Sequence, residues 1–125
     1  MNAARSDAIV FYGATGDLAY KQIFPALSGL VRHSGFDLPV IGVARSNWGV
    51  DQLRERMHES LAAHGGVDEA AFAKLSARLA YVAGDYAHPA TYRRLKQVLG
   101  SATRPLHYLA IPPSMFGTVV EGLAA

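Results

Sequence analysis

One short segment constrains the fold of this chain more than any other, because it joins a strand-like run to a helix-like pattern. Residues 8–12 (Ala-Ile-Val-Phe-Tyr) are continuously apolar, as in a strand that is buried on both faces of a parallel sheet. Residues 13–19 (Gly-Ala-Thr-Gly-Asp-Leu-Ala) follow at once, and apolar residues then recur at helical spacing up to Gly35. Residues 13–19 are therefore predicted to form a tight turn between a β-strand and an α-helix.

The rest of the chain repeats this alternation of strand and helix. Pro25 lies inside the first helical pattern and is expected to kink that helix or divide it in two. Strands separated by helices form right-handed parallel βαβ units, so the predicted fold class is α/β. We expect an incomplete, Rossmann-type doubly wound parallel sheet of about four strands flanked by helices. The further strands are predicted at residues 38–44, 79–83 and 106–111, and the further helices at 50–64, 67–76, 89–100 and 114–123.

Composition excludes several classes of protein. The 125 residues suggest one domain, and they include no cysteine, which removes disulfides and thiolate metal ligands. The five histidines show no metal-ligand spacing, so no metal is assigned. A formal net charge of +2 without a run of Lys or Arg argues against a nucleic-acid partner. No stretch approaches the roughly 20 apolar residues of a membrane helix, and no signal-peptide core is present, so we expect a cytoplasmic location and no membrane partner.

The turn has the composition of a phosphate-binding loop. Gly13 permits a tight turn, Gly16 lets backbone N–H groups approach a phosphate, and the small Ala19 allows the helix to pack closely on the strand. The start of the helix would add unpaired N–H groups and the positive end of the helix dipole. The alternative is a plain turn that uses glycine for geometry alone. Asp17 is explained as a helix cap or dipole partner, with its carboxylate expected to point away from phosphates.

The end of the second predicted strand indicates which dinucleotide would bind. In an NAD-binding fold, an Asp or Glu at this place accepts a hydrogen bond from the ribose 2′-hydroxyl. Here the place is held by Arg45, followed by Ser46, and a guanidinium suits a 2′-phosphate. These residues predict NADP in preference to NAD. The alternative is a surface arginine at a strand end that binds nothing.

Three segments, in order along the chain, resemble glucose-6-phosphate dehydrogenases. Residues 13–21, with Ile-Phe-Pro at 23–25, resemble the Gly-Ala-Ser/Thr-Gly-Asp-Leu-Ala-x-Lys/Arg signature of that family. Residues 40–46 resemble its second strand and its NADP-selecting arginine, and residues 108–116 resemble its Tyr-Leu/Phe-Ala-Leu/Met-Pro-Pro segment. The resemblance implies an NADP-dependent oxidation of glucose 6-phosphate to 6-phosphogluconolactone, in the pentose phosphate pathway, by a homo-oligomeric full-length enzyme.

The resemblance also implies which residues hold the cofactor. The turn is expected to hold the pyrophosphate, Arg45 the 2′-phosphate, residues 85–86 the adenosine side and residues 110–113 the nicotinamide end. Phe116 stands where some members of the family have a Tyr that contacts the cofactor. Lys21 matches a lysine of the family that lies near cofactor and substrate. The alternative, that Lys21 is a solvated lysine on the helix surface, is equally good. The expected cofactor-binding residues are Gly13, Ala14, Thr15, Gly16, Asp17, Leu18, Ala19, Tyr20, Lys21, Arg45, Ser46, Asp85, Tyr86, Ala110, Ile111, Pro112, Pro113 and Phe116.

Two motifs of that family do not occur in the sequence. These are the Glu-Lys-Pro-Phe-Gly segment, which supplies a substrate-binding lysine, and the Asp-His-Tyr-Leu-Gly-Lys motif, which carries the catalytic histidine. His107 precedes Tyr-Leu as in the second motif, but it lies in a predicted strand and is interpreted as a strand histidine. We therefore expect residues 1–125 to be the NADP-binding domain of a longer two-domain enzyme, with no catalytic residue of its own.

Two other classes of protein are weighed against this interpretation. A stand-alone nucleotide-sensing module would have the same turn and no chemistry. A short-chain reductase would need a Tyr-x-x-x-Lys pair in a later helix. Tyr92 and Lys96 have that spacing, but they follow the third strand, which is too early in the chain for such a motif.

Overall fold

Four parallel strands form the middle layer of the structure. The computed structural model describes residues 6–124, and within them the strands lie in the order β3-β2-β1-β4. The chain therefore moves outward from β1 to β3 and then returns to place β4 on the other side of β1, which creates a topological switch point between β1 and β4. The strands are β1 (Ala8–Tyr12), β2 (Val40–Ala44), β3 (Leu79–Ala83) and β4 (Pro105–Leu109).

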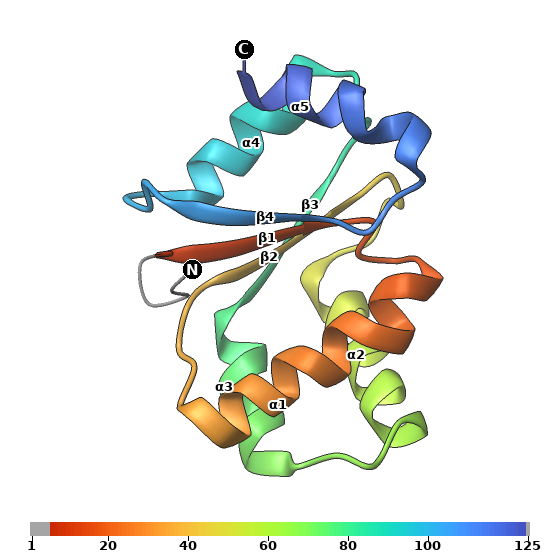
Figure 1. The fold of residues 1–125 in the computed structure, drawn as a ribbon, viewed down its shortest axis with the longest axis vertical. Coiled ribbons are helices and arrows are strands. Elements are labelled where there is room, and N and C mark those ends of the chain that lie inside the picture. Colours follow the sequence, from red (N-terminus) through yellow and green to blue (C-terminus); the bar gives the residue numbers. More distant parts are fainter. Residues whose placement is uncertain (1–5, 125) are drawn as a thin grey trace.

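Helices cover both faces of this sheet (Figure 1). One face carries α1, α2 and α3 over a core that includes Phe11 and Leu53, and the other carries α4 and α5 over a core that includes Val10 and Leu95. β1 thus buries side chains on both sides, as its continuous apolar run predicts. The doubly wound α/β fold is confirmed. The helices are α1 (Phe24–Ser34), α2 (Val50–Ala63), α3 (Glu69–Arg78), α4 (Pro89–Leu99) and α5 (Phe116–Ala124).

Several predicted boundaries are corrected by one or two residues. The second strand begins at Val40, two residues later than predicted, since Pro39 has no N–H to donate and takes part only through its carbonyl, which accepts from Ile9 at 2.9 Å. α3 starts later than predicted because Asp68 caps it, with its Oδ1 accepting the N–H of Ala71 at 3.0 Å.

The other corrections lie at the last strand and the last helix. β4 ends at Leu109 instead of residue 111, because the two prolines at 112–113 cannot extend the hydrogen-bonded ladder. A short 3₁₀ turn, η3 (Pro113–Met115), then precedes α5, where a single helix from residue 114 was predicted.

The first helix is divided at Pro25, as predicted. Its opening part, η2 (Ala19–Ile23), is π-helical, and the N–H of Phe24 reaches back five residues to the carbonyl of Ala19. The next bond of this kind would join Pro25 to the carbonyl of Tyr20, and proline has no N–H. The fully buried Ser60 of α2 donates its hydroxyl to that carbonyl instead. A second helix thereby supplies the hydrogen bond that the proline removes.

Replacing Ser60 by alanine is expected to lower the free energy of unfolding by about 1–3 kcal/mol, because the Tyr20 carbonyl loses its donor in a partly buried place. Chemical denaturation measures this change. Ser34→Ala is the matched control, since the Ser34 hydroxyl donates to the Leu30 carbonyl at an exposed helix end, where water can replace it. Equal effects of the two substitutions would contradict this account of the divided helix.

Candidate nucleotide-binding site

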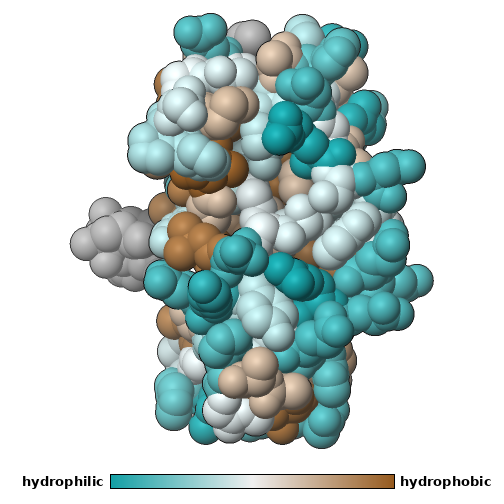
Figure 2. Space-filling model, turned by 90° about the vertical axis from the view of Figure 1, so that its right-hand side faces the viewer, coloured by the Kyte–Doolittle hydropathy of each residue, from teal (hydrophilic) through white to brown (hydrophobic). Residues whose placement is uncertain are grey.

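A cleft of about 510 Å³ opens at the carboxyl ends of the strands. The turn after β1 forms one side, the end of β2 forms another, and the segment after β4 closes it, so the cleft lies at the topological switch point. Figure 2 views this end of the molecule and shows pale and brown residues across the middle, with teal hydrophilic residues above and below. The lining residues are Gly13, Thr15, Gly16, Ala44, Arg45, Ser46, Tyr86, Ala110, Ile111, Pro112, Ser114 and Met115.

Gly13 holds a backbone conformation that only glycine adopts freely. Its φ is +82°, and a Cβ at this position would lie 2.1 Å from the carbonyl oxygen of Ala110. The N–H of Gly13 is shared between the Val43 carbonyl at 2.8 Å and the Tyr86 hydroxyl at 2.9 Å. The turn is therefore fixed to β2 and lies directly against the segment that follows β4.

The start of the first helix adds further backbone donors beside the cleft. The N–H of Gly16 donates to the Gly13 carbonyl at 3.0 Å, which closes the turn, and the N–H of Tyr20 donates to the Gly16 carbonyl at 3.2 Å, which begins the helical pattern. N–H groups in the first turn of a helix have no intrahelical acceptor, and such groups bind phosphate oxygens. The glycine turn therefore leads from the end of β1 directly into the start of a helix, as the phosphate-binding turn of a dinucleotide-binding fold does.

Arg45, at the end of β2, places a positive charge in the lining of the cleft, which the glycine turn also lines. Arg45 is exposed and forms no hydrogen bond or ion pair with any side chain among residues 6–124. The Ser46 hydroxyl lies 3.0 Å from the Thr15 hydroxyl, which ties the end of β2 to the glycine turn. Within the described part of the chain, no Asp or Glu lines the cleft. The positive charge of Arg45 therefore has no counter-charge among the residues that line the cleft.

Two tyrosine hydroxyls form hydrogen bonds with the backbone at the edges of the cleft. The Tyr86 hydroxyl meets the Gly13 N–H, and burial raises its pKa while that hydrogen bond and the charge of Arg45 oppose the shift. The hydroxyl of Tyr81, on β3, donates to the Ser46 carbonyl at 2.6 Å, and burial raises its pKa to about 12. Sequence reasoning missed Tyr81. A tyrosine within an apolar strand was the available signal, because a buried phenol needs a hydrogen-bond partner.

The predicted site residues fall into two groups. Gly13, Thr15, Gly16, Arg45, Ser46, Tyr86, Ala110, Ile111 and Pro112 line the cleft. Ala44, Ser114 and Met115 also line it and were not predicted. The predicted residues outside the lining set are Ala14, Asp17, Leu18, Ala19, Tyr20, Lys21, Asp85, Pro113 and Phe116.

The residues outside the lining have contacts of their own. Ala14 and Ala19 are fully buried beneath the turn. The Asp17 carboxylate lies 3.9 Å from the guanidinium of Arg56, which itself covers the ring of Tyr20 at 4.4 Å. Asp85 shapes the turn before α4, where its Oδ1 accepts the N–H of residue 87 at 2.8 Å. Phe116 is 39% exposed.

His107 lies within β4, as predicted. Its Nδ1 is 2.9 Å from the hydroxyl of the fully buried Tyr12, the two rings are stacked, and burial lowers the pKa of the imidazole. Its contacts are those of a structural histidine. Over residues 6–124, no group of three or more His, Cys, Asp or Glu side chains is placed to hold a metal ion.

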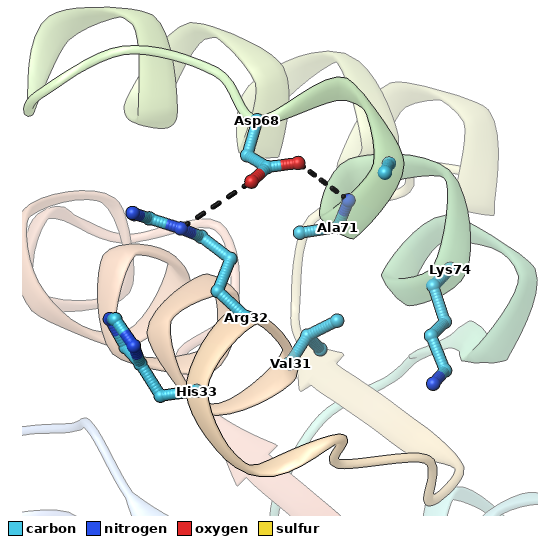
Figure 3. A pocket seen from close by; sticks show the side chains of 7 residues that line it. Val31, Arg32, His33, Asp68, Ala71 and Lys74 are labelled. Atoms are coloured by element: carbon cyan, nitrogen blue, oxygen red, sulfur yellow. Dashed lines mark hydrogen bonds and ion pairs between the residues drawn. The ribbon is translucent and has the colours of Figure 1, made fainter.

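A second hollow, of about 400 Å³, lies between the end of α1 and the start of α3 (Figure 3). An ion pair of 3.4 Å between Arg32 Nε and Asp68 Oδ2 crosses it, and the other oxygen of Asp68 caps α3 through the N–H of Ala71. These groups serve contacts between helices. The hollow shares no lining residue with the cleft at the carboxyl ends of the strands, so we place the candidate site in that first cleft.

A glycine turn at the carboxyl end of the first strand of a doubly wound sheet defines a dinucleotide-binding domain. The chain belongs to the family described as "Glucose-6-phosphate dehydrogenase, NAD binding domain", whose model matches residues 10–125. The resemblance found in the sequence is confirmed, and the family supports a pyridine nucleotide as cofactor. No helix within residues 6–124 has the length and apolarity to cross a bilayer.

Named relatives and solved structures agree with this assignment. Glucose-6-phosphate 1-dehydrogenase 1 of Mycobacterium tuberculosis is 44% identical over 119 residues, which are 95% of this chain and 26% of that protein. The crystal structure of glucose-6-phosphate 1-dehydrogenase from Mycobacterium avium superposes with a TM-score of 0.90 at 43% identity, again over 95% and 26%. A glucose-6-phosphate dehydrogenase in complex with glucose-6-phosphate superposes with a TM-score of 0.83 at 34% identity, over 93% and 26%. The chain thus spans about a quarter of the length of these relatives.

Proposed function

We propose that the cleft binds NADP. The observation that carries this proposal is Arg45, an exposed cation without an ion-pair partner among residues 6–124, at the strand end where an NAD-binding fold usually has an acid. An acid there would repel a 2′-phosphate, whereas a guanidinium offers a planar set of donors that matches its oxygens. The cleft therefore favours the phosphorylated dinucleotide.

The remaining residues of the cleft fit the other parts of such a ligand. Gly13 has no Cβ, which lets the Ala110 carbonyl pack directly against the turn. The first N–H groups of the helix that follows the turn can receive the pyrophosphate. Ser46 adds a hydroxyl beside the 2′-phosphate position, and Ile111 and Pro112 supply an apolar wall at the other end of the cleft. When bound, the nicotinamide of NADP supplies the acceptor for a hydride.

The chain is further proposed to be the cofactor-binding domain of a longer, two-domain enzyme that oxidises glucose 6-phosphate to 6-phosphogluconolactone. The names of its relatives and the share of their length that it spans support this proposal. Apolar side chains around β4 and α5, among them Leu106, Tyr108 and Val120, are 39%, 47% and 56% exposed, as expected where more protein packs. The family resemblance also underlies the proposed homo-oligomeric assembly and cytoplasmic location of that enzyme.

Incubation of the 125-residue chain with glucose 6-phosphate and NADP tests both parts of the proposal. We expect NADP to raise the melting temperature, because it binds only the folded form, and no NADPH to appear in the absorbance. Turnover by this chain alone would contradict the division into a cofactor-binding and a catalytic part. An unchanged melting temperature at millimolar NADP would contradict the cofactor assignment.

A further inference from the structure

We propose that the hydroxyls of Tyr81 and Tyr86 are positioning groups for the two halves of the cleft, Tyr86 for the half that receives the pyrophosphate and Tyr81 for the half that receives the 2′-phosphate. This inference rests on the proposed function, since it assigns parts of the ligand to parts of the cleft. Each hydroxyl forms hydrogen bonds with backbone groups of the cleft and acts on the ligand through them.

Tyr86 is bonded to the backbone of the glycine turn. Its ring is 5% exposed, its hydroxyl accepts the N–H of Gly13 at 2.9 Å, and the same hydroxyl lies 3.3 Å from the Val43 carbonyl, to which it can donate. It therefore joins the turn to β2 through one oxygen atom. A turn with a positive φ at its first residue depends on such bonds, because the residue itself has little preference for one conformation.

The ring of Tyr86 is itself fixed from two sides. Tyr12 packs against it edge-on, with ring centroids 6.1 Å apart, and the Tyr92 hydroxyl donates to its backbone carbonyl at 2.7 Å. Loss of the hydroxyl alone would leave the ring in place. A phenylalanine at this position therefore tests the hydrogen bond and not the packing.

Tyr81 is bonded to the backbone on the other side of the cleft. Its hydroxyl donates to the Ser46 carbonyl at 2.6 Å and lies 3.3 Å from the Ala44 carbonyl, so it spans the residue between them, Arg45. Its own position is fixed by the strand ladder, in which it is the register partner of Gly42. The hydroxyl therefore sets the direction in which the chain leaves β2 and presents the arginine.

The two tyrosine hydroxyls are expected to have different effects on the affinities for the two dinucleotides. NADP and NAD share a pyrophosphate, so the Tyr86 hydroxyl should matter equally to both. Only NADP has a 2′-phosphate, so the Tyr81 hydroxyl should matter to NADP alone. A general loss of stability would lower the affinities for both dinucleotides together, and it cannot produce this difference.

Calorimetric titration of Tyr81→Phe and Tyr86→Phe with NADP and with NAD tests the inference. Loss of one hydrogen bond corresponds to about fivefold in affinity. Tyr86→Phe is expected to weaken both dinucleotides by about fivefold, and Tyr81→Phe to weaken NADP by about fivefold with NAD changed by less than about twofold. Tyr108→Phe is the matched control, an exposed tyrosine on the outer strand β4, and it should change neither affinity.

Amide hydrogen exchange of the ligand-free chain provides a second measurement. Tyr86→Phe should speed the exchange of the Gly13 amide, because half of its shared hydrogen bond is gone before any ligand is present. Unchanged exchange would overturn the positioning role of Tyr86, and the same NADP-to-NAD affinity ratio in both variants would overturn the division between the tyrosines. If the wild-type chain binds neither dinucleotide, the proposed function fails and this inference with it.

Discussion

Replacing Gly13 by alanine is expected to destabilise the chain by about 3 kcal/mol or more and to abolish dinucleotide binding. The residue has a φ of +82°, where an L-residue is strained, and its new Cβ would lie 2.1 Å from the Ala110 carbonyl oxygen. Relief of this clash requires the turn to move away from the segment after β4, and these two segments are walls of the cleft. Chemical denaturation measures the stability, and calorimetry measures the binding.

Gly29→Ala is the control for this experiment. Gly29 lies in the middle of α1, and a Cβ at this position would meet no heavy atom within 4 Å beyond the adjoining backbone of its own helix. Alanine should therefore stabilise the helix by about 0.5–1 kcal/mol and leave binding unchanged. A Gly13→Ala chain as stable as the wild type would show that the turn does not need the left-handed conformation.

The second large effect is expected at Arg45. Arg45→Ala should weaken NADP by about 10- to 100-fold, the range that corresponds to the loss of a hydrogen bond to a charged group. NAD should be affected by less than about twofold, since it has no 2′-phosphate for the guanidinium to meet. Titration of both dinucleotides at one fixed salt concentration measures the change, because screening by salt weakens exposed charge pairs.

Arg93→Ala controls for the loss of a positive charge. Arg93 is exposed on α4 and has no ion pair within residues 6–124, so its removal changes the net charge by the same amount away from the cleft. Its substitution should leave both affinities unchanged. Equal losses of NADP and NAD in Arg45→Ala would remove the basis for cofactor selection by this residue.

Much of the fold could be predicted because its determinants are local. The continuous apolar run at 8–12 indicated a strand buried on both faces, and β1 indeed lies between two cores. Pro25 predicted the division of the first helix through its missing N–H. What replaced that hydrogen bond could not be predicted, because Ser60 lies far along the chain and contacts Tyr20 only in the folded molecule.

The residues of the candidate site that come directly after a strand in the sequence could be predicted. The glycine turn and Arg45 each follow a strand directly, and parallel strands bring their carboxyl ends to one edge. Phe116 was harder to place, because the 3₁₀ turn that precedes it puts Ser114 and Met115 in the cleft lining instead. Tyr81 was missed because its role depends on the register between β2 and β3, which no local pattern specifies.

If this chain is a dinucleotide-binding domain selective for NADP, the unmodified chain should show that selectivity. Calorimetric titration of the unmodified 125-residue chain with NADP and, separately, with NAD tests it most directly. We expect one site per chain and an affinity for NADP that is at least about tenfold higher than for NAD, the ratio that one guanidinium–phosphate contact supplies. Absence of binding, or an affinity for NAD equal to or higher than that for NADP, would contradict it.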